Sequence, residues 1–363
     1  MLHGEYGVTD NYFWKDKRVL ITGHTGFKGS WLSIWLSSIG AEVFGVALDP
    51  QSTPSLFHEA KISDNVTSFI GDIRNLEFLS KVISKVQPEI IFHLAAQPLV
   101  RYSYEQPEET FSTNIMGTVN IFEAVRKSGN VQAIVNVTSD KCYENNEWIW
   151  PYKENDKLGG FDPYSSSKAC SEIISNAYYN SYFKESGTAI ASARAGNVIG
   201  GGDWAEDRLI PDILRSFENK KKVIIRYPLA IRPWQHVLEP LAGYLILAEQ
   251  LFKFKNQFSG PWNFGPYDHD AKNVEWIVSY MVKRWESECG WVKDNELNPH
   301  EATYLKLDIS KAINFLDWKP LWNIEESLEK VIEWHLDWIN GQSAKDICLR
   351  QIKDYTKQKH YQI

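Results

Sequence analysis

The amino-acid sequence predicts an α/β fold built on a doubly wound parallel sheet. Short apolar segments alternate with stretches of helical periodicity through residue 137, which is typical of a parallel sheet with helices on both faces. A chain of 363 residues, 43% of them hydrophobic, can bury the core of one large domain or two ordinary ones. The expected strands are residues 18–22, 42–48, 67–70, 89–94 and 131–137, and the expected helices include 30–39 and 114–127.

A glycine-rich turn joins the first expected strand to the first expected helix. A glycine triplet alone can be a mere turn, but here the order is strand, turn, helix, as a phosphate-binding turn requires. Glycines allow close approach to a pyrophosphate, and free N–H groups at a helix N-terminus attract an anion. The spacing GxxGxxG therefore predicts a Rossmann-type domain that binds a dinucleotide. The expected contacts are Gly23, Thr25, Gly26, Phe27, Lys28 and Gly29.

Acidic residues end the next two expected strands. Asp49 follows the second strand, 26 residues after Gly23, where a carboxylate can accept hydrogen bonds from the adenosine ribose. No basic cluster follows to receive a 2′-phosphate, which favours NAD over NADP, although an ordinary surface loop is the alternative for Asp49. Asp72, followed by Ile73, is expected near the adenine. The fourth strand ends at Ala95, Ala96 and Gln97, where small residues let the backbone pass close to a cofactor, and Leu94 at the strand end is expected among the same contacts.

Two polar clusters follow the fifth expected strand. The first comprises Thr138, Ser139, Asp140 and Lys141, at the carboxyl end of the strand, where ligands bind in open parallel sheets. In the second, Tyr164 and Lys168 are four residues apart and share one face of a helix. An ammonium beside a phenol favours phenolate, so we expect Lys168 to lower the pKa of Tyr164. An isolated pair at this spacing is more often part of an exposed helix, and only the rest of the chain favours catalysis.

Composition excludes several classes of protein. The net charge of −7, with interspersed signs, argues against nucleic-acid binding. No apolar run approaches the roughly 20 residues of a membrane span, and the N-terminus lacks a signal-peptide segment. Four scattered cysteines without a CxxC pair, and histidines without ligand spacing, predict neither a disulfide framework nor a metal site. These features indicate a cytoplasmic, reduced protein.

The second half of the chain is expected to hold the substrate. Residues 1–190 are assigned to the cofactor domain, with 235–260 packing back on it. Residues 191–234 and 261–363 are assigned to a smaller, discontinuous α/β domain, and the charged residues from Lys345 onward are expected to fray. Arginines suit bidentate contacts to phosphate, although structural ion pairing is the alternative for Arg232.

The motifs together resemble the extended short-chain dehydrogenase/reductase family. The matching segments are TGHTGFKG at 22–29, LAAQPLVRYSY from 94, TSDKCYEN from 138, YSSSKACSE from 164, RAGNVIGGGDW from 194 and IRPWQHVLEPL from 231. They span residues 19–240, and the segment at 300–312 fits as well. Within the family the chain is similar to the nucleotide-sugar 4,6-dehydratases. Its Asp140-Lys141 pair, where the dTDP-glucose and GDP-mannose enzymes carry Asp-Glu, resembles the group that acts on CDP-glucose.

This resemblance implies NAD as cofactor and a nucleotide sugar as substrate. It adds Asn114 to the cofactor residues and names substrate contacts at Arg101, Asn197, Arg208 and Arg232, with Asn197 and Arg232 on the diphosphate. Family members pair through helices like 115–127 and 165–183, which implies a homodimer or homotetramer. The resemblance also implies a 3,6-dideoxyhexose pathway for surface polysaccharide such as O-antigen.

The expected reaction is a dehydration without net redox change. Tyr164 takes the C4 hydroxyl proton with help from Ser139. Lys141, as a neutral amine or through a water, removes the C5 proton, and Asp140 protonates the leaving C6 hydroxyl. A 4-epimerase or reductase on the same scaffold is the alternative, but it needs no such pair. A protein that only senses dinucleotide could dispense with Tyr164 and Lys168.

Overall fold

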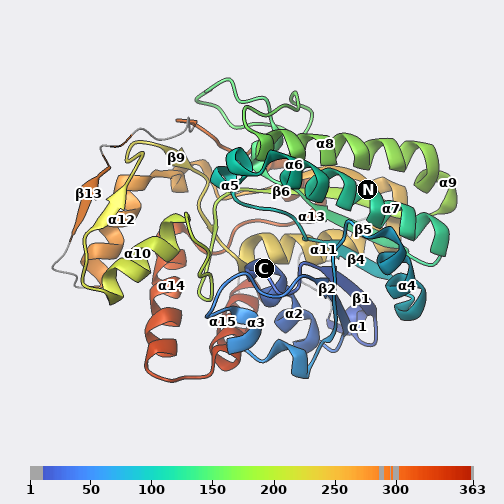
Figure 1. Ribbon diagram of the computed structural model, residues 1–363, viewed down its shortest axis with the longest axis horizontal. Helices are drawn as coiled ribbons and strands as arrows, with labels where there is room; N and C mark the ends of the chain where they lie inside the picture. Colours follow the sequence, from blue (N-terminus) through green and yellow to red (C-terminus); the bar gives the residue numbers. More distant parts are fainter. Residues whose placement is uncertain (1–10, 286–289, 295, 297–301, 361–363) are drawn as a thin grey trace.

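The computed structural model describes residues 11–285, 290–294, 296 and 302–360 (Figure 1). Its centre is a seven-stranded sheet in the order β11-β6-β5-β4-β1-β2-β3, in which every neighbouring pair is parallel. The predicted doubly wound sheet is confirmed. Its strands are β1 Arg18–Thr22, β2 Glu42–Ala47, β3 Thr67–Ile70, β4 Ile90–His93, β5 Ala133–Val137, β6 Ala189–Ala195 and β11 Gly260–Phe264.

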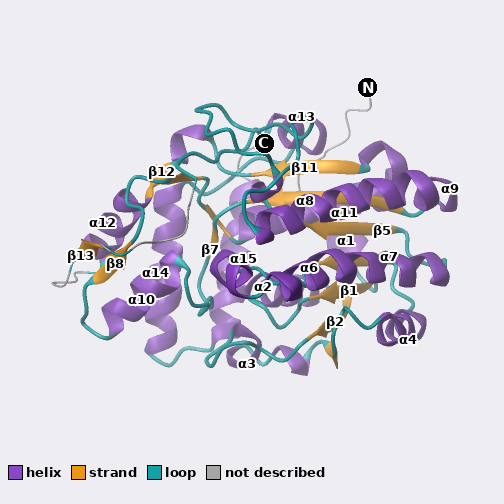
Figure 2. Cartoon of the chain, turned by 45° about the horizontal axis from the view of Figure 1, so that its top comes forward, coloured by secondary structure: helices purple, strands orange, loops and turns teal. Residues whose placement is uncertain are grey.

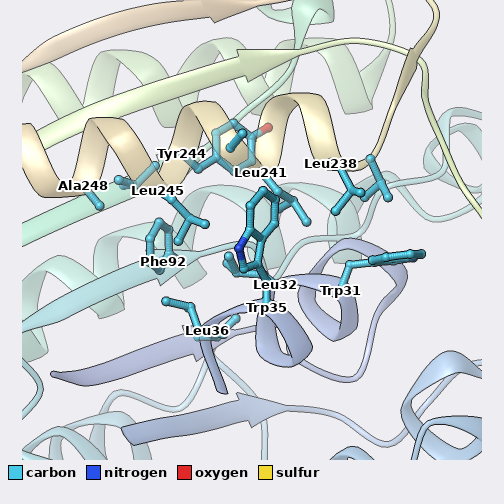
Figure 3. Close-up of a cluster of buried hydrophobic side chains, with 14 of the residues drawn as sticks. Trp31, Leu32, Trp35, Leu36, Phe92, Leu238, Leu241, Tyr244, Leu245 and Ala248 are labelled. Atoms are coloured by element: carbon cyan, nitrogen blue, oxygen red, sulfur yellow. The ribbon is translucent and has the colours of Figure 1, made fainter. Parts of the chain in front are cut away.

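Alternate residues of the central strands belong to different hydrophobic clusters. In β1, Val19 and Ile21 join one cluster and Leu20 the other, because successive side chains point to opposite faces. The first cluster includes α2 Phe27–Ser38 and α11 Leu238–Phe254. Figure 3 shows Trp35 of α2 between Phe92 of β4 and the leucines of α11. This face of the sheet is sealed by large apolar side chains.

The second cluster covers the other face. It contains apolar residues of α4 Leu76–Val86 and α7 Gly117–Ser128, with partly buried side chains of α8 Pro163–Tyr178 packed against it. Four shorter helices lie at the chain start or around these: α1 Asn11–Trp14, α5 Val100–Glu105, α6 Pro107–Phe111 and α9 Lys184–Ser186. Helix α8 thereby brings its first turn to the carboxyl edge of the sheet.

A smaller lobe builds its own core beside that edge. Its elements are α10 Leu209–Glu218, β8 Val223–Ile225, α12 Val274–Arg284, β13 Trp291–Lys293 and α14 Ile324–Ile339. Figure 2 shows β8, β12 and β13 on the side of the molecule away from α4 and α9. The remaining elements are α3 Leu56–Glu59, β7 Val198–Ile199, β9 Ile231–Arg232, β10 Gln235–His236, β12 Lys272–Asn273, α13 Ser310–Leu316 and α15 Ala344–His360.

Two expectations about chain organisation need correction. The boundary set at residue 190 lies inside β6, whose seven residues all belong to the main sheet, and the boundary at 260 cuts the start of β11. The segment from Lys345, expected to fray, forms α15. Its residues Ile347 and Tyr355 are buried in the same cluster as α2, so tertiary packing overrides its charged composition.

Candidate active site

The glycine-rich turn leaves no room for side chains at two of its glycines. A Cβ on Gly29 would lie 2.1 Å from the Gly23 carbonyl oxygen, and one on Gly23, with φ +78°, would lie 2.8 Å from the Ala95 nitrogen. Gly26 is the N-cap of α2, and no side chain caps this helix. N–H groups at its N-terminus are therefore available to an anion. The turn fits the pyrophosphate of a dinucleotide.

The acidic residues expected at the adenosine flank this turn. Asp49 is exposed just beyond β2, and the Thr25 hydroxyl donates to the Leu48 carbonyl oxygen (2.9 Å), tying the turn to that strand end. Arg74 donates to one Asp72 carboxylate oxygen from two nitrogens (2.9 and 2.6 Å). These bonds lower the pKa of Asp72. The carboxylate stays charged and is still 30% exposed, so it can also accept from a ligand.

Asn114 holds a loop in place. Its Oδ1 accepts from the Gln97 backbone N–H (2.8 Å), and its Nδ2 donates to the Gln97 carbonyl oxygen (3.1 Å) and the Ser167 hydroxyl (2.8 Å). The residue lies in a turn of π-helix, Ser112–Met116, and is 2% exposed. Asn114 thus connects the loop after β4 to the helix that carries Tyr164.

The turn after β5 presents an acid and an amine. The Ser139 hydroxyl donates to Asp140 Oδ1 (3.0 Å) and accepts from the Lys141 backbone N–H (3.2 Å). Asp140 is 2% exposed, and its Oδ2 has no hydrogen-bond partner among the described residues. A Cβ on Gly196 would lie 1.9 Å from that oxygen, so only glycine leaves room for it. The half-buried Lys141 lines the same cavity as Asp140.

Tyr164 and Lys168 lie at the start of α8, but their electrostatics differ from expectation. Burial raises the pKa of Tyr164 to about 12, opposed by a hydrogen bond with Ser139 and by the charge of Arg208. The strongest influences on this pKa are burial, Ser139, Asp140, Arg208 and Asp162, so the predicted lowering by Lys168 is not the leading effect. Burial also lowers the pKa of Lys168 itself to about 8, and its ammonium donates to the Val137 carbonyl oxygen (3.3 Å).

One cavity of about 890 Å³ brings the predicted chemistry together. It lies between the carboxyl ends of the strands and the smaller lobe, and residues of both line it. The predicted site residues that line it are Phe27, Lys28, Leu94, Ala96, Arg101, Thr138, Ser139, Asp140, Lys141, Tyr164, Lys168, Asn197, Arg208 and Arg232. Those that do not are Gly23, Thr25, Gly26, Gly29, Asp49, Asp72, Ile73, Ala95, Gln97 and Asn114. These residues shape the cofactor turn and the neighbouring strand ends.

Two of the three arginines expected at the substrate already have carboxylate partners. Arg101 from α5 pairs with Asp207 (2.9 Å), and Arg226 at the end of β8 approaches the same carboxylate (3.4 Å). Arg208 pairs with Asp203 (3.2 Å). These charges line the cavity from both lobes, so a substrate phosphate would meet ion pairs there.

The other two predicted substrate residues are held by the backbone. Arg232 is 2% exposed, and its Nη1 donates to the Ile231 carbonyl oxygen (2.8 Å). Asn197 has φ +40°, in the left-handed region that few side chains adopt, and its carbonyl oxygen accepts from the Gln235 N–H (3.3 Å). Both residues border the cavity between β6 and the smaller lobe.

Lys28 lies in a second environment that the sequence did not predict. Expected only in the phosphate-binding turn, it also lines the cavity. Burial, then the charges of Lys168 and Arg208, lower its pKa to about 7, against the opposing charge of Asp140. The cation therefore adjoins the catalytic groups, and only the folding of α2 toward the end of β5 makes this visible.

Sequence reasoning also missed a buried ion pair behind the turn. Glu172 and Arg194 pair at 2.9 Å, with side chains 4% and 2% exposed. One signal was present: Glu172 follows Lys168 by four residues and so shares its helix face. Its partner, 22 residues further on, could not be identified without the fold.

The described residues contain neither a candidate metal site nor a candidate membrane-spanning helix. No group of three His, Cys, Asp or Glu side chains there could hold a metal ion. No described helix is long and apolar enough to cross a membrane.

A family comparison agrees with this geometry. Residues 20–331 match the family model described as GDP-mannose 4,6 dehydratase, which covers most of the chain. The chain belongs to this family. The resemblance to extended short-chain dehydrogenase/reductase enzymes and to nucleotide-sugar 4,6-dehydratases is thereby confirmed.

Individual relatives differ in how similar their sequences are to this chain. The CDP-glucose 4,6-dehydratase of Salmonella typhimurium is 56% identical over 353 residues, covering 96% of this chain and 98% of the relative. The UDP-glucose 4-epimerase of Pisum sativum is 26% identical over 344 residues, covering 88% and 95%. Identity to the dehydratase is therefore about twice that to the epimerase.

Solved structures support the fold. The epimerase Mth375 of Methanothermobacter thermautotrophicus superposes with a TM-score of 0.78 at 23% identity, covering 92% of this chain and 96% of that one. The dTDP-glucose 4,6-dehydratase of Bacillus anthracis, in complex with NAD, gives 0.74 at 22% identity, covering 91% and 99%. At such identities the likeness establishes the Rossmann-type fold of this chain.

Proposed function

We propose that this protein is an NAD-dependent hydro-lyase that dehydrates CDP-glucose to CDP-4-keto-6-deoxyglucose. The observation that carries the proposal is Asp140, buried at the cavity with one carboxylate oxygen bonded to Ser139 and the other without a partner in the described part of the chain. A 4-epimerase or reductase acts at C4 alone and has no use for an acid beside a free amine. The 56% identity to a named CDP-glucose 4,6-dehydratase supports the nucleotide.

The cofactor would lie along the glycine-rich turn and the strand ends. The uncapped N-terminus of α2 would hold the pyrophosphate, with Asp49 at the ribose and Asp72 and Ile73 near the adenine. Residues 94–97, together with Thr138, would border the nicotinamide side, and Asn114 would hold that loop. When bound there, NAD would supply the acceptor for the C4 hydride of the sugar and the donor of the hydride that C6 receives.

Oxidation at C4 would be assisted by Tyr164 and Ser139. Tyr164 takes the proton of the C4 hydroxyl, and Ser139 hydrogen-bonds the same oxygen. Because burial raises the pKa of Tyr164 to about 12, this transfer needs positive charge nearby. Lys168 and Arg208 line the same cavity, and the cationic nicotinamide ring would add to their charge.

Elimination would use the turn after β5. The new C4 carbonyl acidifies the C5 hydrogen, which Lys141 removes as a proton while Asp140 gives a proton to the departing C6 hydroxyl, releasing water. Lys141 then returns a proton to C5. Tyr164 ends with one extra proton and Asp140 with one fewer, and solvent restores both. The substrate has lost one water and the cofactor is unchanged.

The substrate diphosphate would bind among the arginines of the rim. Arg101 and Arg208 would exchange their carboxylate partners for phosphate oxygens, and Arg232 with Asn197 would hold the other side. Arg226 is a further candidate that shares Asp207 with Arg101. This arrangement would set the sugar between Tyr164 and the turn after β5.

Assembly and setting are also proposed. Helices α7 and α8 would pair with a second copy in a homodimer or homotetramer, since Ile173 and Tyr182, on and just after α8, are 57% and 47% exposed. The protein would act in the cytoplasm, without nucleic-acid or membrane partners, in the synthesis of deoxysugars for surface polysaccharide such as lipopolysaccharide.

The decisive experiment incubates the purified protein, without added cofactor, with CDP-, dTDP-, UDP- and GDP-hexoses. Loss of one water from CDP-glucose, seen by mass, is the expected result and would show that NAD is retained. Unchanged mass with inverted configuration at C4 would indicate an epimerase. No product, even after NAD is added, would overturn the proposal.

A further inference from the structure

The ion pair between Glu172 and Arg194 lies directly behind the cavity. Arg194 Nε donates to Glu172 Oε1 (3.0 Å) and Nη2 donates to Oε2 (2.9 Å), a bidentate arrangement. Although burial opposes charge on Arg194, Glu172 and neighbouring groups raise its pKa above the ordinary value, so the guanidinium stays charged. Neither residue lines the cavity. The pair cannot touch a substrate there, but it can position what does.

The pair holds both ends of the turn that carries Ser139, Asp140 and Lys141. At the start, the Thr138 hydroxyl donates to Glu172 Oε1 (2.5 Å). At the end, Arg194 Nη1 donates to the Tyr143 hydroxyl oxygen (2.7 Å). The three reactive residues lie between these two anchors.

The anchor is itself fixed by strand β11 and by the loop at residues 152–154. The Tyr143 hydroxyl donates to Asn263 Oδ1 of β11 (2.7 Å), and Arg194 Nη1 also donates to the Glu154 carbonyl oxygen (3.0 Å). Asn263 Nδ2 donates to the Tyr152 carbonyl oxygen (2.9 Å). The network therefore runs from α8 through β6 to β11, and every link is inside the protein.

We propose that Glu172 and Arg194 are positioning residues that set the geometry of Asp140 and Lys141 for elimination. This inference rests on the proposed dehydratase function. The contacts of the Asp140 carboxylate do little to fix its orientation. Among the described residues, one of its oxygens has no hydrogen-bond partner and the other is bonded only to the adjacent Ser139. Its direction is set by the backbone of the turn, and the backbone is anchored at Thr138 and Tyr143.

The kinetic test compares Glu172→Gln, Thr138→Val and the double variant with the wild-type protein on CDP-glucose. Displacement of reacting groups by about 1 Å can cost roughly 100-fold in rate, so each single variant is expected to lower kcat about 10- to 100-fold. For Glu172→Gln the KM should change less than about threefold, because Glu172 does not line the cavity. The double variant should be no slower than Glu172→Gln, because Glu172 acts through Thr138.

A matched control separates positioning from general destabilisation. Glu239 is another fully buried carboxylate, which accepts from the Trp322 N–H (2.8 Å) and the Tyr355 hydroxyl (2.7 Å) in a different part of the protein. Glu239→Gln should lower thermal stability as Glu172→Gln does, with kcat of the folded enzyme unchanged. Equal kcat in folded Glu172→Gln and wild type, or additive losses in the double variant, would overturn the inference.

Amide hydrogen exchange tests the positioning without turnover. The Lys141 and Cys142 N–H groups donate to the Ser139 side chain (3.2 Å) and carbonyl oxygen (3.3 Å) within the turn. Both amides should exchange faster in Glu172→Gln than in Glu239→Gln. If the wild type leaves CDP-glucose unchanged, the proposed function fails, but equal exchange in the two variants would still be needed to reject the positioning role.

Discussion

The two ends of the cavity are built by opposite means. At the catalytic end, Asp140 is 2% exposed and its turn is anchored by an ion pair whose side chains are at most 4% exposed. At the arginine rim, the Arg101 and Asp207 side chains are 46% and 42% exposed. The same kind of interaction, arginine with carboxylate, is therefore fixed in one region and open to water in the other.

Burial decides what each ion pair can do. An exposed pair contributes only about 0–1 kcal/mol, because water and salt screen it, so a phosphate can displace its carboxylate at little cost. Breaking a buried pair costs about 3–5 kcal/mol, because an uncompensated charge stays behind. The rim can exchange partners when substrate binds, whereas the catalytic turn keeps one geometry.

The largest effect is expected from Asp140→Asn at the catalytic end. Asparagine keeps the shape and can still accept from Ser139, but it cannot give the proton that C6 elimination requires. Loss of general acid catalysis should lower kcat roughly 10²- to 10⁴-fold with the melting temperature little changed. Turnover at the wild-type rate, measured by water loss in the mass spectrum, would contradict the assignment of Asp140.

Gly196→Ala should disturb the same end of the cavity by a steric clash alone. The added Cβ would lie 1.9 Å from Asp140 Oδ2, so the carboxylate must move, and kcat should fall about 10- to 100-fold. Gly187→Ala is the matched control, since its Cβ would meet nothing within 4 Å although φ is +82°. That control should cost about 1 kcal/mol of stability and leave kcat intact. If both variants keep full activity, Gly196 does not position Asp140.

Acid should destabilise the folded protein through His93, whose Nδ1 forms a hydrogen bond with the Thr22 hydroxyl (2.7 Å) beneath the strand ends. Burial, then Lys168, lower its pKa from 6.5 to about 3, so the unfolded chain binds a proton that the folded one rejects. The contribution of His93 to the free energy of unfolding is fully present above pH 6.5 and is lost as the pH falls toward 3. Between pH 7.5 and 5.5 this one group should remove about 1.4 kcal/mol.

Urea unfolding of His93→Gln at the two pH values measures this loss. The variant should lose about 1.4 kcal/mol less than the wild type between them, whatever its absolute stability. His269→Gln, on the exposed His269, is the control and should keep the wild-type difference. An unchanged difference in His93→Gln would show that His93 is not held neutral.

The smallest effect is expected at the rim. Asp207→Asn would free Arg101 and Arg226 from a carboxylate that competes with the diphosphate. Since exposed pairs contribute about 0–1 kcal/mol, CDP should bind up to roughly fivefold more tightly by calorimetry. The gain should shrink as salt rises. Weaker binding would mean that Asp207 orients the arginines for phosphate instead of competing with it.

Much of the fold could be predicted because its signals are local. Residues 18–22 and 67–70 form the expected strands with the expected bounds. The phosphate-binding turn needed glycines where a Cβ would collide with backbone, and glycines stand there. Composition alone misjudged α15, because its Ile347, Ile352 and Tyr355 are buried in the same cluster as the apolar side chains of α2.

The sequence predicted which residues meet at the cavity, but it did not predict their pKa shifts or their charged partners. Ser139, Asp140, Tyr164 and Lys168 meet at one cavity, as strand ends of a parallel sheet require. The pKa of Tyr164 depends on how deeply it is buried and on Ser139 and Arg208, neither of which is near it in sequence. The cavity position of Lys28 and the partners of Arg101 likewise depend on segments that meet only after folding.

The sequence by itself determined the class of sheet, the glycine-rich turn and the polar residues at the strand ends, because each depends on residues within a few positions of one another. Tertiary structure alone decided which charges face which. It placed Arg194 against Glu172, gave Asp207 two arginines and left Asp140 Oδ2 without a partner. Electrostatic interactions and burial depend on distance in space, and the distance between remote residues exists only once the chain has folded.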